Sequence, residues 1–212
     1  MSISTPERTD TRAAASVLAN GPRWRWYHGA IFYAMVQVMT FSLGGLVSAL
    51  RGDEIKRARD LVGNADYFKR LHQSKIAPPS WAFAPAWTIN NVFSIYGMLR
   101  VLNRPTSTRG RNEYLALQSA SWLNYILFNA AYFSLRSPLN ALVLTLSMFV
   151  LTILSGFVAL FRLKDTVVAL SLATLLLWLI IASTAAIFQA AWNEDELYGV
   201  GPFFEPVPAL EK

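Results

Sequence analysis

Residues 166–193 read TVVALSLATLLLWLIIASTAAIFQAAWN, a run of 28 residues without a lysine, arginine, aspartate or glutamate. A helix needs about 20 mostly apolar residues to cross the hydrocarbon core of a bilayer. A helix on the surface of a soluble protein would instead carry charged side chains along one face. This run therefore predicts a transmembrane helix.

Four more charge-free runs precede it. They cover residues 27–50, 76–99, 114–135 and 137–161, and each has at least 22 residues. Backbone polar groups in lipid must be hydrogen-bonded within the protein, and a helix achieves this within one segment. The alternating pattern of a membrane β-barrel is absent. The sequence thus predicts an all-α membrane protein, a bundle of five transmembrane helices.

The expected organisation is one membrane domain, residues 28–193, between two polar ends. Residues 1–27 form a polar N-terminal extension, and residues 194–212 form an extended acidic C-terminal tail. We place the five helices at about residues 29–50, 78–102, 114–135, 138–161 and 166–193.

The loop between the first two helices is long and partly helical. Ile55, Ala58, Leu61 and Val62 lie on one face of a helix drawn over residues 53–62, and most basic residues lie elsewhere. This pattern is typical of an amphipathic helix on the bilayer surface. We expect the loop either to cover the end of the bundle or to rest on lipid.

Composition excludes several classes of protein. The chain is 54% hydrophobic and 15% charged, against about 25% charged residues in soluble domains. It has no cysteine, which excludes disulfides, thiolate metal sites and cysteine nucleophiles, and two histidines are too few for a multi-histidine centre. No charged residue lies inside a span, which argues against ion pathways and hydrolytic chemistry.

The net charge of +6 arises from residues that flank the spans. This distribution is typical of a membrane protein and predicts no nucleic-acid partner. The side that holds the N-terminus has ten basic residues and the other side has nine. The positive-inside rule therefore only slightly favours a cytoplasmic N-terminus. We expect a multi-pass integral membrane protein, and the sequence does not identify its membrane.

Small residues suggest close helix packing. Thr40, Gly44 and Ser48 recur every four residues, and a similar stripe runs from Thr145 to Ala159. Such stripes let helices approach closely, either within one chain or in a homodimer. Packing within the chain is the preferred interpretation.

Tryptophans mark the second and fifth spans. The second helix is expected to begin at Pro78 and Pro79, because proline is tolerated in a first helical turn. Trp81 suits an interfacial anchor, whereas Trp87 lies deeper. Trp178 lies near the middle of its span, where an indole either packs in the core or lines a pocket. Spacing alone favours packing.

These residues resemble a motif of the TspO/MBR family, the tryptophan-rich sensory or translocator proteins. The family's second helix begins with two prolines followed by tryptophans, and the similar residues here are Pro78, Pro79, Trp81, Phe83, Pro85, Trp87 and Thr88. Further similar positions are Tyr67, Phe68, Leu71, Leu123, Asn124, Tyr125, Tyr132, Phe133, Trp178 and Asn193. The resemblance covers about residues 30–193. Asn91 replaces a tyrosine of the family, so the chain is identified as a divergent member.

The resemblance implies a ligand pocket inside the bundle, under the first loop. The implied ligand is a porphyrin, a related tetrapyrrole or another hydrophobic small molecule, with a sensory, transport or stress-related role and no obligatory cofactor. Trp87 and Trp178 would carry the family's proposed light-dependent porphyrin breakdown, the only enzymatic activity considered. The expected ligand-binding residues are Tyr67, Phe68, Pro79, Trp81, Phe83, Trp87, Asn91, Asn124, Phe128, Tyr132 and Trp178.

An alternative is a non-catalytic accessory or assembly subunit of a larger membrane complex. Departures from the family motifs and the two polar ends suggest it, and Phe203 with Phe204 would offer a docking point in the tail. The expected partners are therefore the lipid bilayer, the hydrophobic ligand, and a second copy or a membrane-complex partner.

Overall fold

A computed structural model of the protein describes residues 24–53 and 65–212. The amphipathic helix expected over residues 53–62 and most of the N-terminal extension lie outside the described residues. The described elements, in chain order, are α2 (Trp26–Leu50), α3 (Ala65–Arg70), α4 (Ser80–Leu102), α5 (Arg111–Asn129), η2 (Ala130–Ser134), α6 (Pro138–Phe157), η3 (Val158–Arg162), α7 (Thr166–Leu170) and α8 (Ala173–Trp192).

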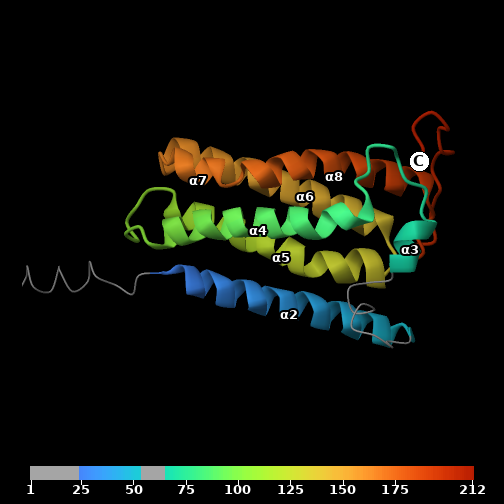
Figure 1. Ribbon diagram of the computed structural model, residues 1–212, viewed down its shortest axis with the longest axis horizontal. Helices are drawn as coiled ribbons and strands as arrows, with labels where there is room; N and C mark the ends of the chain where they lie inside the picture. Colours follow the sequence, from blue (N-terminus) through green and yellow to red (C-terminus); the bar gives the residue numbers. More distant parts are fainter. Residues whose placement is uncertain (1–23, 54–64) are drawn as a thin grey trace, which may run out of the picture.

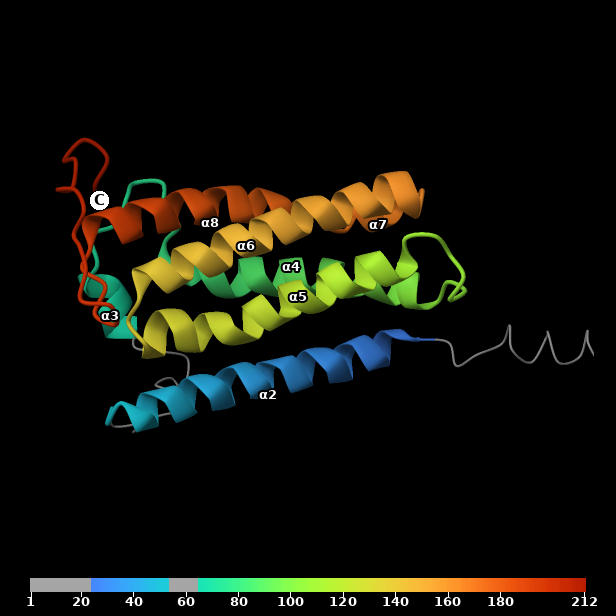
Figure 2. The same cartoon turned by 180° about the vertical axis from the view of Figure 1, so that it is seen from behind.

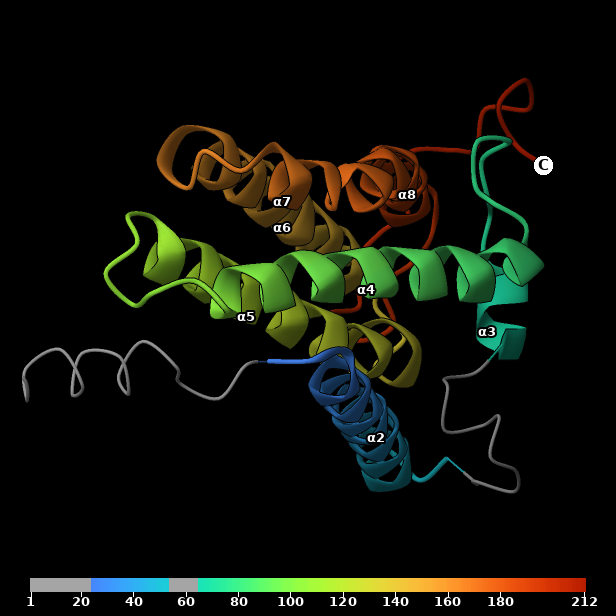
Figure 3. The ribbon, with the colours of Figure 1, turned by 60° about the vertical axis from the view of Figure 1, so that its left-hand side comes forward.

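Five long helical segments form a bundle, which confirms the predicted fold class (Figures 1 and 2). They are α2, α4, α5 with η2, α6 with η3, and α7 with α8. Within the described part of the chain there is no strand, only two isolated bridges. α2 lies at the edge of the bundle and packs on α5 and η2, and Figure 3 shows it crossing the others obliquely.

Among the described residues, three segments are long and apolar enough to cross a membrane: Trp26–Leu50, Pro138–Arg162 and Thr166–Trp192. α4 and α5 are less apolar because they carry amides and hydroxyls. Those side chains are buried between helices rather than exposed to lipid, and include Asn90, Asn91, Ser94, Gln118, Ser121 and Asn129. Average hydropathy therefore understates how well these two helices suit the bilayer.

The small-residue stripes pack inside the chain. Thr40, Gly44 and Ser48 are buried on α2, and the hydroxyl of Ser134 donates to the carbonyl oxygen of Gly44 at 2.9 Å. The second stripe is also buried, on α6 and η3. Small side chains allow helices to pack this closely.

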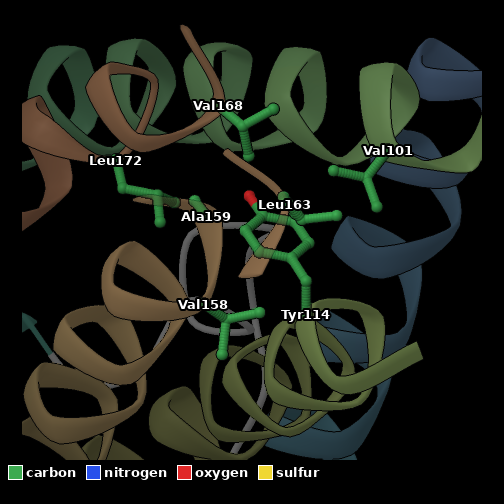
Figure 4. Packing of buried hydrophobic residues seen from close by; sticks show 7 residues of the cluster. All are labelled: Val101, Tyr114, Val158, Ala159, Leu163, Val168 and Leu172. Carbon is green, nitrogen blue, oxygen red and sulfur yellow. The ribbon is translucent and has the colours of Figure 1, made fainter. Parts of the chain in front are cut away.

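The end of the bundle that carries the α4–α5 loop, here called the loop end, has its own apolar core. Figure 4 shows Tyr114 pointing from α5 into a cluster of valine and alanine side chains from α4, η3 and α7. Leu163 and Leu172, which follow η3 and α7 in the chain, complete it. The absence of a side chain at Gly97 lets α4 approach α7, since a Cβ there would lie 2.2 Å from Ser171 Oγ.

Asp165 anchors the loop end. Its carboxylate accepts hydrogen bonds from the backbone N–H groups of Val167 and Val168 at 3.1 and 3.2 Å, so it caps α7. It also accepts from Arg100 Nε at 2.7 Å and from Arg104. Burial alone would raise the pKa of Asp165, but these hydrogen bonds and the two guanidinium charges hold it below its usual value.

The opposite end, here called the tail end, holds α3 and the C-terminal tail (Figure 1). Asp195 is 1% exposed and accepts from Ser137 Oγ at 2.6 Å and from the backbone N–H of Leu139 at 3.0 Å. It thereby places a carboxylate at the N-terminus of α6, where the helix dipole favours negative charge. The tail is thus held against the bundle from its first residues.

Candidate functional site

Eleven aromatic rings form a continuous series of contacts through the interior. We call them the aromatic cluster: Phe32, Tyr67, Phe68, Phe83, Trp87, Trp122, Tyr125, Phe128, Tyr132, Phe133 and Trp178. They come from α2, α3, α4, α5, η2 and α8. No lysine, arginine, aspartate or glutamate belongs to the cluster.

Two tryptophans from different helices meet at its centre. The ring centroids of Trp87 and Trp178 lie 6.3 Å apart, with the planes at 72°. Trp178 also meets Phe83 at 5.4 Å, and Trp87 meets Tyr125 at 5.2 Å. Each contact is edge to face, which is a favourable geometry for aromatic pairs. Both indoles are half-buried, and they pack against each other and against rings of the neighbouring helix turns.

α3 covers the cluster at the tail end. Phe68 contacts Phe83 at 5.7 Å and Phe133 at 6.5 Å, and Tyr67 contacts Tyr132 at 6.1 Å. The short helix is amphipathic, so its aromatic residues face the bundle while Lys69 and Arg70 are exposed.

The phenol groups at this end remain neutral and help to join the helices. Burial raises the pKa of Tyr67 above its usual value, and the carboxylates of Glu196 and Asp195 raise it further. The hydroxyl of Tyr132 donates to Gln189 Oε1 at 2.8 Å, a buried bond that joins η2 to α8. Neutral groups of this kind suit contact with an apolar ligand.

A small, partly open cavity lies against the cluster, and Trp87, Trp122 and Tyr125 belong to both. Its volume is about 20 Å³. Its lining residues are Trp87, Asn91, Ser94, Gln118, Ser121, Trp122, Tyr125, Met148 and Leu175. Pockets that hold drug-sized ligands span about 300 Å³ or more. A ligand of that size would therefore fit only if the rings of the cluster moved apart.

The sequence-predicted site residues fall into two groups. Tyr67, Phe68, Phe83, Trp87, Phe128, Tyr132 and Trp178 meet in the aromatic cluster, and Asn91 lines the adjoining cavity. The other three lie elsewhere. Trp81 is 75% exposed on the outside of α4, and Pro79 is the exposed N-cap of that helix. Asn124 Nδ2 donates to Ser147 Oγ at 2.9 Å and joins α5 to α6.

Four members of the cluster were not among the predicted site residues. They are Phe32, Trp122, Tyr125 and Phe133. The spacing of Trp122 and Tyr125, three residues apart, places them on one face of α5 and is the signal that could have identified them.

The C-terminal tail closes the tail end above α3 and α4. The backbone N–H of Lys75 donates to the carbonyl oxygen of Leu210 at 2.7 Å, and the N–H of Lys212 donates to Gln73 at 2.9 Å. His72 Nδ1 lies 2.5 Å from Glu211 Oε1. We call this pairing of residues 209–212 with residues 72–77 the C-terminal clasp. It secures the segment that leads into α4.

The described residues contain no group of three or more side chains suited to a metal ion. What the site offers is a set of indole, phenol and phenyl faces beside neutral amides and hydroxyls. Such a surface suits a flat, largely apolar molecule.

Comparison with known proteins gives one finding. The sequence profile of the TspO/MBR family matches residues 32–192. The matched range covers three quarters of the chain and includes every residue of the aromatic cluster. Comparison with curated proteins gives no match.

Proposed function

The chain belongs to the TspO/MBR family, whose members are integral membrane proteins built as five-helix bundles, and on this premise we propose that its aromatic cluster binds a porphyrin or a related tetrapyrrole. Members of this family bind porphyrins. The observation that supports the proposal most is the contact between Trp87 and Trp178, 6.3 Å apart at the centre of the cluster. The role would be sensory, transport or stress-related.

The chemistry of the cluster suits such a ligand. A tetrapyrrole has a flat π-system, and indole faces stack on it favourably. The edge-to-face contacts between rings would be exchanged for face-to-face contacts with the macrocycle. Ionised propionates are costly to bury without a partner. We therefore expect them to remain at the tail end, where exposed cations such as Arg70 lie.

Titration with protoporphyrin IX tests this proposal. Purified full-length protein in lipid nanodiscs is expected to shift the Soret absorbance band of the porphyrin in a saturable, one-to-one manner at micromolar concentration. Empty nanodiscs give the shift due to lipid alone. A titration identical to that of empty nanodiscs would contradict the proposal.

Access to the cluster is expected to depend on the C-terminal clasp. Deletion of residues 209–212 removes the backbone bonds to Gln73 and Lys75 and the pairing of Glu211 with His72. Each such bond contributes about 1 kcal/mol. The three bonds together contribute about 3 kcal/mol. We expect porphyrin association, followed by stopped-flow absorbance, to become about a hundredfold faster, since about 1.4 kcal/mol corresponds to a factor of ten.

A matched control for the deletion lies in the same tail. Phe204 is 70% exposed and is outside the clasp, so Phe204→Ala should leave the association rate unchanged. An unchanged rate in the deletion variant would show that the ligand enters elsewhere, for example between α4 and α8.

The alternative function as an accessory subunit rests on a different observation. The backbone N–H groups of Phe203 and Phe204 donate to the carbonyl oxygen of Ala191, while their side chains are 53% and 70% exposed. These two rings would offer an apolar contact to a partner in a membrane complex.

A further inference from the structure

The cavity beside the aromatic cluster differs in character from the cluster. Four of its lining residues are polar: Asn91 and Ser94 from α4, and Gln118 and Ser121 from α5. All four are more than nine-tenths buried. They lie in the middle of membrane-spanning helices, where polar groups cannot reach bulk water.

Three of these side chains each carry one polar atom that makes no hydrogen bond of good geometry with the described residues. The atoms are Asn91 Nδ2, Ser94 Oγ and Ser121 Oγ. Gln118 differs, because its Nε2 donates to Ser155 Oγ at 3.0 Å. A buried polar atom without a hydrogen bond is destabilising, and most such atoms in native proteins are satisfied by the chain or by ordered water.

The cavity has the size and chemistry of a hydration site. Its volume of about 20 Å³ exceeds the roughly 10–15 Å³ that one water molecule needs. Buried waters typically make about three hydrogen bonds, and three unpartnered atoms line this cavity. The amide N–H donates, while the hydroxyls both donate and accept. A neutral molecule is required, since no charged residue lines the cavity.

We propose that this cavity is a binding site for one water molecule that bridges α4 and α5 in the middle of the bilayer. The water accepts a hydrogen bond from Asn91 and bonds to the hydroxyls of Ser94 and Ser121. It satisfies three buried polar groups that the protein leaves open and forms a polar floor beneath Trp87. Trp87, Trp122 and Tyr125 line this cavity and also belong to the aromatic cluster, so the proposal concerns the protein without porphyrin.

Water-edited solid-state NMR tests the proposal on the full-length protein in lipid bilayers without porphyrin. Magnetisation is expected to pass from water to the side-chain amide of Asn91, whose signal is assigned by its loss in Asn91→Leu. The double variant with Ser94→Ala and Ser121→Ala removes two of the three partners and should abolish this transfer. Absence of transfer in the wild-type protein would overturn the proposal.

Ser119→Ala is the matched control. Ser119 lies on the same helix as Ser121, but it is exposed to the outside and its hydroxyl donates to the carbonyl oxygen of Leu115 at 2.9 Å. This variant should retain the transfer to Asn91. Loss of the transfer in Ser119→Ala would show that the signal does not report the cavity, and would also overturn the proposal.

The unfolding temperature of the double serine variant gives a second test. A water-filled cavity and a dry cavity predict changes of different sign in this temperature. If water fills the site, the double serine variant loses hydrogen bonds and its unfolding temperature falls below that of the wild type. If the site is dry, the same variant removes two unsatisfied hydroxyls, and its unfolding temperature stays equal or rises. An unfolding temperature equal to or above that of the wild type would contradict the proposal.

Discussion

Replacement of Trp178 by alanine is expected to weaken protoporphyrin IX binding at least tenfold, and the double variant with Trp87→Ala about a hundredfold. Trp178 of α8 contacts both Trp87 and Phe83 of α4, so its ring makes the aromatic contacts between these two helices. Stacking on an aromatic ring contributes about 1–3 kcal/mol, and about 1.4 kcal/mol is a factor of ten in affinity. The Soret titration measures this directly, because the readout is the porphyrin and not the mutated fluorophore.

Trp81→Ala is the control for both variants. Trp81 lies on the same helix as Trp87 and is the same residue type, but it is 75% exposed and outside the cluster. We expect its removal to leave the affinity unchanged. Equal losses in Trp81→Ala and Trp178→Ala would mean that porphyrin binds to the lipid-facing surface, and would contradict an internal site.

Replacement of Asp165 by alanine is expected to lower the free energy of unfolding by about 3 kcal/mol. The carboxylate caps α7 and accepts hydrogen bonds from both Arg100 and Arg104, and it is 4% exposed. Loss of an N-cap alone costs about 1 kcal/mol, and loss of the charged hydrogen bonds adds to it. Thermal unfolding in the same detergent or nanodisc measures the change.

Glu113→Ala is the matched control at the same end of the bundle. Glu113 pairs with Arg162 at 2.8 Å, but both side chains are about half exposed. Exposed ion pairs contribute less than about 1 kcal/mol, so this variant should unfold close to the wild-type temperature. An effect as large as that of Asp165→Ala would contradict the distinction drawn between the two carboxylates.

The same carboxylate predicts a pH dependence with a definite sign. The folded-state pKa of Asp165 is lower than its unfolded value. Its contribution to stability is therefore complete above about pH 4, the usual pKa of aspartate, and is lost as the pH falls through the folded-state value. The difference in stability between wild type and Asp165→Ala should shrink at low pH. A difference that stayed constant would contradict this origin.

Charge-free runs were sufficient to predict the fold class, because the bilayer leaves few alternatives for an apolar segment of more than 20 residues. The second helix was expected to begin at Pro78 and Pro79. In the structure α4 begins at Ser80, and Pro79 is its N-cap rather than part of its first turn. The two π-helical segments were not predicted, since neither AAYFS at η2 nor VALFR at η3 has a local composition that distinguishes it from an α-helix.

The roles of the two buried aspartates also escaped prediction. Asp165 and Asp195 lie in loops, and nothing in their immediate sequence shows that partners from distant helices surround them. The acidic tail appeared to be a simple extension. Its pairing with residues 72–77 is made largely by backbone hydrogen bonds. Because every residue carries the same backbone groups, the composition of the tail does not predict this pairing.

Helical periodicity explains which predicted site residues meet. Phe83, Trp87 and Asn91 follow one another at intervals of four residues. Each interval rotates the side chain by about 40° beyond one full turn of the helix, so all three stay on one face of α4. Trp81 is six residues before Trp87, which places it about 120° away around the helix. The family motif names residue types in order, but it does not state which face each one occupies.

The indole N–H signals of Trp87 and Trp178 would show whether a porphyrin lies against these two rings inside the bundle, as we propose. In an NMR spectrum of the full-length protein in nanodiscs, protoporphyrin IX is expected to shift the indole signals of Trp87 and Trp178 strongly through its ring current. The signal of Trp81 should stay in place. Unmoved signals for Trp87 and Trp178, with a shifted signal for Trp81, would place the porphyrin outside the bundle and exclude the proposed internal site.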